Sequence, residues 1–309
     1  MSQGLDRLRA NIAKVYLGNP EAIDRLLRCL LARGHALIED VPGVGKTILA
    51  SALAKSVDCA FTRLQLTPDM LPSDVLGVTM FDQETGKFEF RKGPVFTDIL
   101  LADEINRTTP RTQTALLEAM SEGHVSMDGQ VYELGQPFMV VATQNPYEFE
   151  GTYLLPENQL DRFLMRISLG YPPAEAESRM LELRPASTVL QGLEPVLHGD
   201  DVVALQNRVD EIKVSPAVRD YIVNLARATR EHEDIEVGLS PRGALALAHA
   251  GRATALMDER DHVTPEDVLD NLLPVGAHRV VLRDTAGGVA WDRAAATLRQ
   301  ATQRVSPPL

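Results

Sequence analysis

The chain has little cysteine and a shortage of positive charge, and each shortage narrows the functions open to it. Its 309 residues include only two cysteines, Cys29 and Cys59, too few for a disulfide framework or a zinc site built from several cysteines. We expect both to be buried, reduced thiols. Against 43 aspartates and glutamates stand 31 lysines and arginines, which gives a formal charge of −12. Because nucleic acids and anionic membranes select clustered positive charge, this balance argues against broad binding to either.

Long hydrophobic runs are also missing. The most apolar stretches, residues 26–38 and 98–103, are broken by Arg or Asp well before the roughly 20 residues that a membrane-spanning helix needs. The first residues mix charged and apolar side chains at helical spacing and lack the apolar centre of a signal peptide. We therefore expect a cytoplasmic protein with no integral membrane segment. Its length is enough for one large domain or two ordinary domains with a buried core.

The first half of the chain alternates short β-rich runs with helical patterns, which is typical of a parallel sheet with helices on both faces. Two runs, residues 98–103 and 138–143, are almost continuously apolar, as expected for central strands covered on both sides. Helices are expected over residues 46–57, 72–77 and 110–122. The five expected strands are residues 35–39, 60–66, 98–103, 138–143 and 165–170.

The second half of the chain shows helical periodicity and almost no strand signal. Three pairs of a hydroxyl residue and a proline repeat one helix-start pattern, an N-cap side chain with proline at the first helical position. Residues 184–201 are expected to form a connecting loop. We predict an α/β domain over residues 1–171 and a smaller all-helical domain over residues 172–309. The three pairs are Ser215-Pro216, Ser240-Pro241 and Thr264-Pro265.

Two short stretches interrupt the alternation of strands and helices in the first half. Residues 81–96 and 123–135 each alternate polar and apolar side chains around a turn signal, Thr85-Gly86 in the first and Asp128-Gly129 in the second. This pattern predicts two β-hairpins. They are either surface hairpins with no role in function or insertions that take part in it, and the choice depends on the function of the domain that carries them.

Residues 40–47, DVPGVGKT, follow the first expected strand and open the first expected helix, where a phosphate-binding loop belongs. The glycines let backbone N–H groups close around a polyphosphate, and the helix N-terminus adds partial positive charge. Lys46 would reach the β- and γ-phosphates, and the Thr47 hydroxyl would ligate Mg²⁺. The residues expected to bind the nucleotide are Pro42, Gly43, Val44, Gly45, Lys46, Thr47 and Ile48.

Polar residues follow two of the expected strands. Asp103 ends the third strand and is placed to hold the water shell of Mg²⁺, and Glu104 can orient and polarise the attacking water. Asn145 follows the fourth strand, and ligands of an open parallel sheet bind at the carboxyl ends of its strands. Paired acids can also cap a loop, and Asn145-Pro146 is also a turn signal. Behind a phosphate-binding loop, the functional interpretation is favoured.

Four segments together resemble the MoxR-type AAA+ ATPases: EDVPGVGKT, ILLADEINRTTPRTQTALLEAMSEGHV, VVATQNPYEFEGTYLLPENQLDRFLMR and LSPRGALAL. The likeness runs from about Leu17 to about Leu282. It implies a three-layer αβα P-loop domain with a parallel five-stranded sheet, followed by a helical lid, with an insertion in helix 2 and a hairpin before sensor 1. It also implies hexameric rings that use ATP and Mg²⁺ as chaperones for client proteins, in assembly or metal loading. Partners of the family often carry a von Willebrand factor A domain.

The resemblance assigns roles to the residues singled out above. Lys46 and Thr47 match Walker A, and Asn145 matches sensor 1. Asp103 and Glu104 match Walker B. Asp40 stands where the general Walker A pattern has its first glycine, so we assign it no phosphate contact.

Two arginines complete the expected site. Arg162 matches the arginine finger, which would neutralise transition-state charge on ATP bound by the neighbouring subunit. Arg166, four residues on, is a competitor for that role, although it also fits the start of the fifth strand. Arg242 matches sensor 2, and the lid would place its cation on the γ-phosphate.

Three other functions stay open at this point. One is a nucleic-acid motor, favoured by Lys87, Arg91 and Lys92 in the first hairpin and opposed by the absence of Lys and Arg from the second. Another is a nucleotide-gated binding module that turns over slowly, for which Asp40 leaves room. The last is a magnesium-chelatase-like motor subunit, which one sequence separates poorly from the MoxR type.

Overall fold

The computed structural model describes residues 2–145, 151–182, 186–283 and 291–308. Its centre is a five-stranded sheet with the strand order β2-β5-β8-β1-β9, in which all pairs are parallel. The five strands match the five that the sequence predicts, which confirms the parallel sheet. They are β1 (Ala36–Glu39), β2 (Phe61–Gln65), β5 (Ile99–Asp103), β8 (Met139–Gln144) and β9 (Met165–Ile167).

The sheet forms the middle of three layers, because alternate residues of each strand point to opposite faces. On one face Ile38, Leu101 and Val141 pack with apolar residues of the first three helices. On the other face Leu100 and Val140 pack with apolar residues of α5. The helices of this domain are α1 (Ser2–Ala13), α2 (Pro20–Leu31), α3 (Lys46–Ser56), α4 (Pro72–Leu76), the short 3-10 helix η1 (Ile105–Arg107), α5 (Pro110–Glu122) and α6 (Glu157–Leu160).

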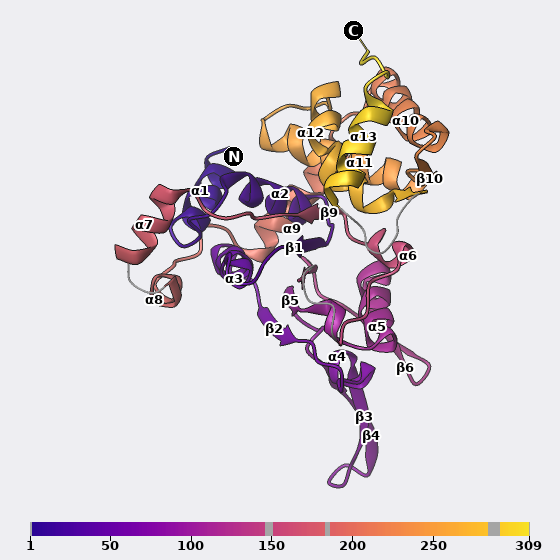
Figure 1. Ribbon diagram of the computed structural model, residues 1–309. Helices are drawn as coiled ribbons and strands as arrows, with labels where there is room; N and C mark the ends of the chain where they lie inside the picture. Colours follow the sequence, from indigo (N-terminus) through magenta and orange to yellow (C-terminus); the bar gives the residue numbers. More distant parts are fainter. Residues whose placement is uncertain (1, 146–150, 183–185, 284–290, 309) are drawn as a thin grey trace.

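The second half is helical, and α10 to α13 lie together at the upper right of Figure 1. Each predicted N-cap hydroxyl accepts a hydrogen bond from the backbone N–H three residues on, so these helices begin where the sequence places them. The split at residue 171 stays a prediction. The helices are α7 (Ala174–Glu182), α8 (Ala186–Gln191), α9 (Gly199–Glu211), α10 (Pro216–Glu231), α11 (Pro241–Met257), α12 (Pro265–Gly276), η2 (Ala277–Arg279, 3-10) and α13 (Trp291–Thr302).

Two details of the second half differ from the sequence analysis. One short antiparallel pair, β10 (Ile235–Val237) with β11 (Val281–Leu282), lies among the helices. Strands of three and two residues are too short to give an alternating pattern. Residues 184–201 are not all loop, since α8 lies within them and α9 begins at Gly199.

Both predicted hairpins are present, and the first projects from the bottom of the molecule in Figure 1. Its strands are β3 (Gly77–Asp82) and β4 (Lys87–Lys92), so it begins four residues earlier than predicted. The second joins β6 (His124–Met127) to β7 (Gln130–Glu133). The rings of Phe90 and Tyr132 stack with centroids 4.2 Å apart, so the two hairpins contact each other.

The two cysteines are free thiols, as expected. Cys29 is buried, but Cys59 is only half-buried because it precedes an edge strand. Burial raises the pKa of both thiols to about 12. Within the described residues, none of the helices has both the length and the apolar content to cross a membrane.

Candidate active site

The loop between β1 and α3 has the shape of a phosphate cradle. Gly43 and Gly45 have φ angles of 87° and 95°, a left-handed backbone that favours glycine. Gly45 is also the N-cap of α3, so the helix begins directly at Lys46 with its N-terminus toward the loop. Beside it lies a cavity of about 340 Å³, lined by Pro42, Gly43, Gly45, Lys46, Thr47, Ile48, Asp103, Glu104, Thr143 and Asn145.

That cavity, called the P-loop cavity below, gathers most of the residues predicted to bind nucleotide. The exception is Val44, whose side chain is buried in the core cluster on the α3 side of the sheet. Lys46 is half-buried, and its Nζ donates to the carbonyl oxygens of Asp40 (2.5 Å) and Gln144 (3.1 Å). Burial lowers the pKa of Lys46, and the nearby acids, Asp40 first, oppose that shift.

Asp40 does not point at the cradle but at the chain that leaves the sheet. Its Oδ2 accepts hydrogen bonds from the Ser168 hydroxyl (2.9 Å) and from the N–H groups of Leu169 (2.7 Å) and Gly170 (2.8 Å). Burial alone would raise the pKa of this carboxyl, but the N–H groups of Gly170 and Val41 and the Ser168 hydroxyl hold the pKa below its ordinary value. Asp40 therefore ties the start of the phosphate loop to the segment that runs toward the lid.

Asp103 ends β5 and is almost fully buried. Its Oδ2 accepts two hydrogen bonds from Arg63 on the neighbouring strand β2, from Nη2 at 2.7 Å and from Nε at 3.2 Å. Its Oδ1 accepts the hydroxyl proton of Thr143 at the end of β8. The carboxylate is thus fixed from both sides.

Glu104 has a left-handed backbone with φ +57°, which turns the chain sharply at the end of β5. Its N–H donates to the Thr143 Oγ1 at 2.9 Å. Its carboxylate accepts a hydrogen bond from Gln65 Nε2 at 2.8 Å and lies 3.0 Å from Arg107 Nε. A water molecule that Glu104 orients must therefore replace or join these partners.

Asn145, the predicted sensor, follows β8 and lines the P-loop cavity with 8% of its surface exposed. Pro146, its partner in the predicted turn, lies outside the described residues. Asn145 thus reaches the cavity from the third of three neighbouring strand ends, as the sequence analysis expected.

The two predicted arginines lie elsewhere, in a separate cavity of about 270 Å³ that we call the arginine cavity. Arg162 and Arg242 both line it, together with Asp161 and Arg279. Arg162 donates through Nη1 to the Leu117 carbonyl (2.8 Å) and to the Ser121 hydroxyl (2.6 Å). Among the residues that line the P-loop cavity, neither arginine is found.

Arg166, the competing candidate for the finger role, is part of the central sheet. It lies in β9, 7% exposed, and forms an ion pair with Glu39 of β1. Its guanidinium also lies 3.9 Å from the centroid of the Trp291 ring. Burial lowers the pKa of Arg166 to about 10 even though Glu39 opposes that shift. The Arg166 side chain is therefore held inside the fold, between the carboxylate of Glu39 and the ring of Trp291.

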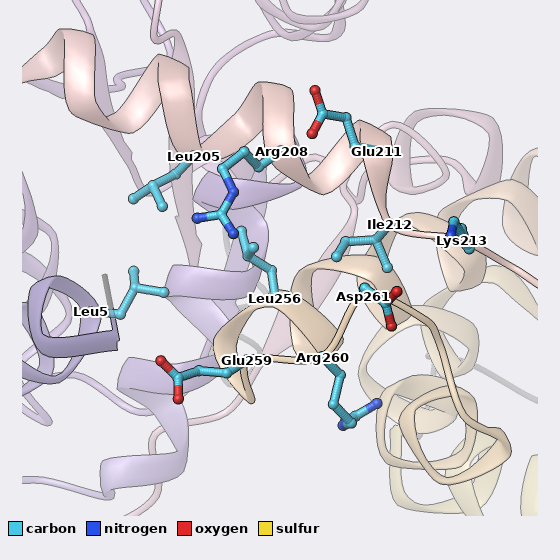
Figure 2. A pocket seen from close by; sticks show the side chains of 10 residues that line it. All are labelled: Leu5, Leu205, Arg208, Glu211, Ile212, Lys213, Leu256, Glu259, Arg260 and Asp261. Carbon is cyan, nitrogen blue, oxygen red and sulfur yellow. The ribbon is translucent and has the colours of Figure 1, made fainter.

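A third cavity of about 600 Å³, shown in Figure 2, lies between α1, α9 and the turn after α11. It is lined by acids and bases in similar number, and Arg260 is already paired with Asp258 and Asp267 at 3.0 and 2.6 Å. A lining of mixed charge does not favour one kind of ligand.

The oxygen atoms of Thr47 and Asp103 face the same cavity as Lys46, and oxygen ligands are what Mg²⁺ prefers. The donor set therefore fits Mg²⁺ held between these side chains and a nucleotide. In the described part of the chain, no group of three or more His, Cys, Asp or Glu residues is arranged to hold a metal ion.

The sequence analysis gave no role to three residues that contact the two acids of the site: Arg63, Gln65 and Arg107. Arg63 and Gln65 are two residues apart on β2, so both side chains lie on the same face of the sheet, beside the end of β5. The sequence signal was limited to their position near the end of the second expected strand. Their partners become visible only once the strand order is known.

Comparison with known proteins agrees with this geometry. Residues 35–165 match the model of the ATPase family associated with various cellular activities (AAA), and residues 227–301 match the model of the AAA lid domain. A solved structure of a candidate ATPase from Cytophaga hutchinsonii superposes with a TM-score of 0.88 at 36% identity, covering 100% of this chain and 96% of that chain.

Curated relatives cover nearly the same length. The uncharacterized protein YeaC of Bacillus subtilis is 48% identical over 277 residues, 89% of this chain and 86% of YeaC. Chaperone MoxR1 of Mycobacterium tuberculosis is 40% identical over 287 residues, 90% of this chain and 76% of MoxR1. On these matches, with a three-layer core and a helical lid, the chain belongs to the MoxR family of AAA+ ATPases.

Proposed function

We propose that this protein hydrolyses ATP with Mg²⁺ and uses the energy to remodel client proteins. The observation that carries the proposal is the P-loop cavity. Lys46, Thr47, Asp103, Glu104 and Asn145 come from separate places in the sequence and line it together. A lysine, a hydroxyl, two acids and an amide at the carboxyl ends of parallel strands suit phosphoryl transfer to water.

Each residue has a distinct task in that reaction. The backbone of the loop and the N-terminus of α3 bind the phosphates, and Lys46 exchanges its carbonyl partners for phosphate oxygens. Thr47 and Asp103 would hold Mg²⁺, which neutralises phosphate charge when bound. Glu104 orients the attacking water, and Asn145 holds a water or a phosphate oxygen. Pro42, Gly43, Gly45 and Ile48 shape the binding surface.

The P-loop cavity lacks a cation for the transition state beyond Lys46 among the residues that line it. Arg162 and Arg242 line the arginine cavity instead. We therefore assign the finger role to Arg162, acting on ATP held by a neighbouring copy, with Arg242 beside it. This arrangement needs a closed ring, and we take a hexamer as its form, as in the family.

The two hairpins are the surfaces we assign to the client. Phe81 and Phe88 on the first hairpin are 54% and 74% exposed, which is unusual for phenylalanine. Hydrolysis would shift the lid against the core and move both hairpins. A protein with a von Willebrand factor A domain is the partner we favour, in the cytoplasm. If a variant lacking residues 84–87 keeps its ATPase and still remodels its client, the role of the hairpin is wrong.

The test of the function is phosphate release from ATP at several protein concentrations, with Glu104→Gln as the matched variant. A specific activity that rises with concentration and is lost in the variant supports a ring-forming ATPase. Activity that is absent, or equal in the variant, contradicts the proposal and favours a nucleotide-gated binding module. Stimulation by DNA or RNA would favour the nucleic-acid motor.

A further inference from the structure

Thr143, which precedes Asn145 by two residues and has no role assigned above, joins the two acids of the site. It is the second-last residue of β8, is 1% exposed, and lines the P-loop cavity. Its hydroxyl donates to Asp103 Oδ1 and accepts from the N–H of Glu104 at 2.9 Å. One small side chain is thus bonded to the side chain of one acid and to the main chain of the next.

The direction of these bonds follows from the chemistry of the groups. A carboxylate can only accept, and a backbone N–H can only donate. The single proton of the Thr143 hydroxyl must therefore point at Asp103, which leaves an oxygen lone pair for Glu104. A residue with only a donor or only an acceptor in this place would satisfy one acid and not the other.

The bond to Glu104 matters because of the backbone there. A φ of +57° is unfavourable for a glutamate and persists where surrounding structure holds it. The Thr143 oxygen fixes the N–H of this residue, while Gln65 and Arg107 hold its carboxylate. When the carboxylate exchanges those partners for a water molecule, the hydroxyl of Thr143 still holds the main chain in place.

We propose that Thr143 is a positioning residue for hydrolysis: its hydroxyl fixes Asp103 and the backbone of Glu104 in one geometry, and thereby sets the rate of the chemical step rather than the affinity for ATP. The proposal rests on the ATPase activity proposed above. Without the Thr143 hydroxyl, both acids would still be present, but the Asp103 side chain and the Glu104 backbone would no longer be held in one position relative to each other. A misplacement of about 1 Å in such a site can cost about 100-fold in rate.

The experiment compares the full-length wild type with Thr143→Ser, Thr143→Val and Thr254→Val. Serine keeps the hydroxyl, whereas valine keeps the β-branched shape and loses it. Thr254 is the matched control, a buried threonine in α11 that donates to the Ala250 carbonyl (3.0 Å) and accepts from Asn271 Nδ2 (2.8 Å). Single-turnover hydrolysis, equilibrium ATP binding, and hydrogen exchange of the Glu104 amide are measured on each.

We expect Thr143→Val to hydrolyse ATP about 100-fold more slowly while its Kd for ATP stays within about threefold. Its Glu104 amide exchanges faster, and both changes are reversed in Thr143→Ser. Thr254→Val keeps the wild-type rate and Glu104 exchange. A valine variant that equals the serine variant in rate and exchange overturns the inference, as does an equal loss of rate in Thr254→Val.

The inference and the proposed function fail in different ways. A wild type that hydrolyses no ATP overturns the proposed function, and the inference with it. A wild type that hydrolyses ATP while Thr143→Val matches it overturns the inference alone.

Discussion

The P-loop cavity and the arginine cavity differ in the charge of the residues that line them and in the elements that supply those residues. The first is lined by two acids, one lysine and the phosphate loop, all at the carboxyl ends of sheet strands or beside them. The second is lined by Arg162, Arg242 and Arg279, with elements of both the core and the lid around it. In the proposed function, the first cavity binds the magnesium nucleotide and the second supplies the arginines that act on it.

A single chain keeps the residues that line the P-loop cavity apart from Arg162 and Arg242, which line the arginine cavity. Arg162 is a side chain held in place, with Nη1 bonded to the end of α5. We assign its Nε and Nη2 to the nucleotide of a partner copy. Oligomerisation would therefore be part of catalysis, which is the central claim of this account.

The largest expected effect is a loss of hydrolysis rate without a loss of ATP binding when the arginine cavity is altered. Arg162→Ala should lower kcat about 10³-fold and leave the Kd for ATP unchanged, because the finger acts only on transition-state charge. Phosphate release and fluorescent-nucleotide binding measure the two quantities. Arg219→Ala, an exposed arginine on α10, is the control. Weaker ATP binding in Arg162→Ala would mean that this side chain contacts its own nucleotide.

The next largest expected effect is a loss of kcat when an acid of the P-loop cavity is replaced. Glu104→Gln should lower kcat about 10²-fold and keep ATP bound, because the amide fills the same volume but polarises water poorly. Isothermal titration with ATP and a single-turnover assay are sufficient. Loss of binding together with rate would show that Glu104 holds the cradle rather than the water.

Arg166 should affect stability instead of chemistry, which sharpens the contrast with Arg162. Arg166→Met leaves Glu39 as a buried unpaired acid and should lower the free energy of unfolding by about 3 kcal/mol. The double variant Glu39→Gln/Arg166→Met should recover most of that loss. Urea unfolding measures both. A single variant that keeps full stability but loses ATPase activity would restore Arg166 as a finger candidate.

The smallest effect is the pH dependence of the Asp40 contact. The pKa of Asp40 is held below its ordinary value of about 3.9, so its hydrogen bonds stabilise the fold above that pH. The contribution is lost as the pH falls through the lower folded pKa. Asp40→Asn should lower the Tm by about 2 °C at pH 7. The difference from wild type should shrink below pH 4, and a constant difference would contradict the assignment.

Local patterns predicted much of the fold and of the P-loop cavity. The β5 and β8 runs are apolar because both faces of each strand are buried, and the glycine loop needs left-handed backbone at Gly43 and Gly45. The Ser-Pro and Thr-Pro caps depend on only four consecutive residues. Each of these features depends on residues that are close together in the sequence, so it can be predicted from the sequence alone.

The rest depends on contacts between distant residues. Asp40 finds its partners more than a hundred residues away, at Ser168 to Gly170. Arg63 reaches Asp103 only because β2 lies beside β5 in the sheet. The burial of Arg166 could not be predicted from its spacing with Arg162, because it depends on the distant residues Glu39 and Trp291.

The most direct test of the central claim mixes two inactive proteins, Arg162→Ala and Glu104→Gln. If the finger acts between copies, a mixed ring contains sites with the acid of one variant and the arginine of the other. With equal mixing, half of the acids and half of the fingers are intact, so about a quarter of the sites regain activity. If the finger acts between copies, the mixture should release phosphate at about one quarter of the wild-type rate. No recovery in a mixture that forms mixed rings would show that both cavities must serve the nucleotide of their own chain, which contradicts the central claim.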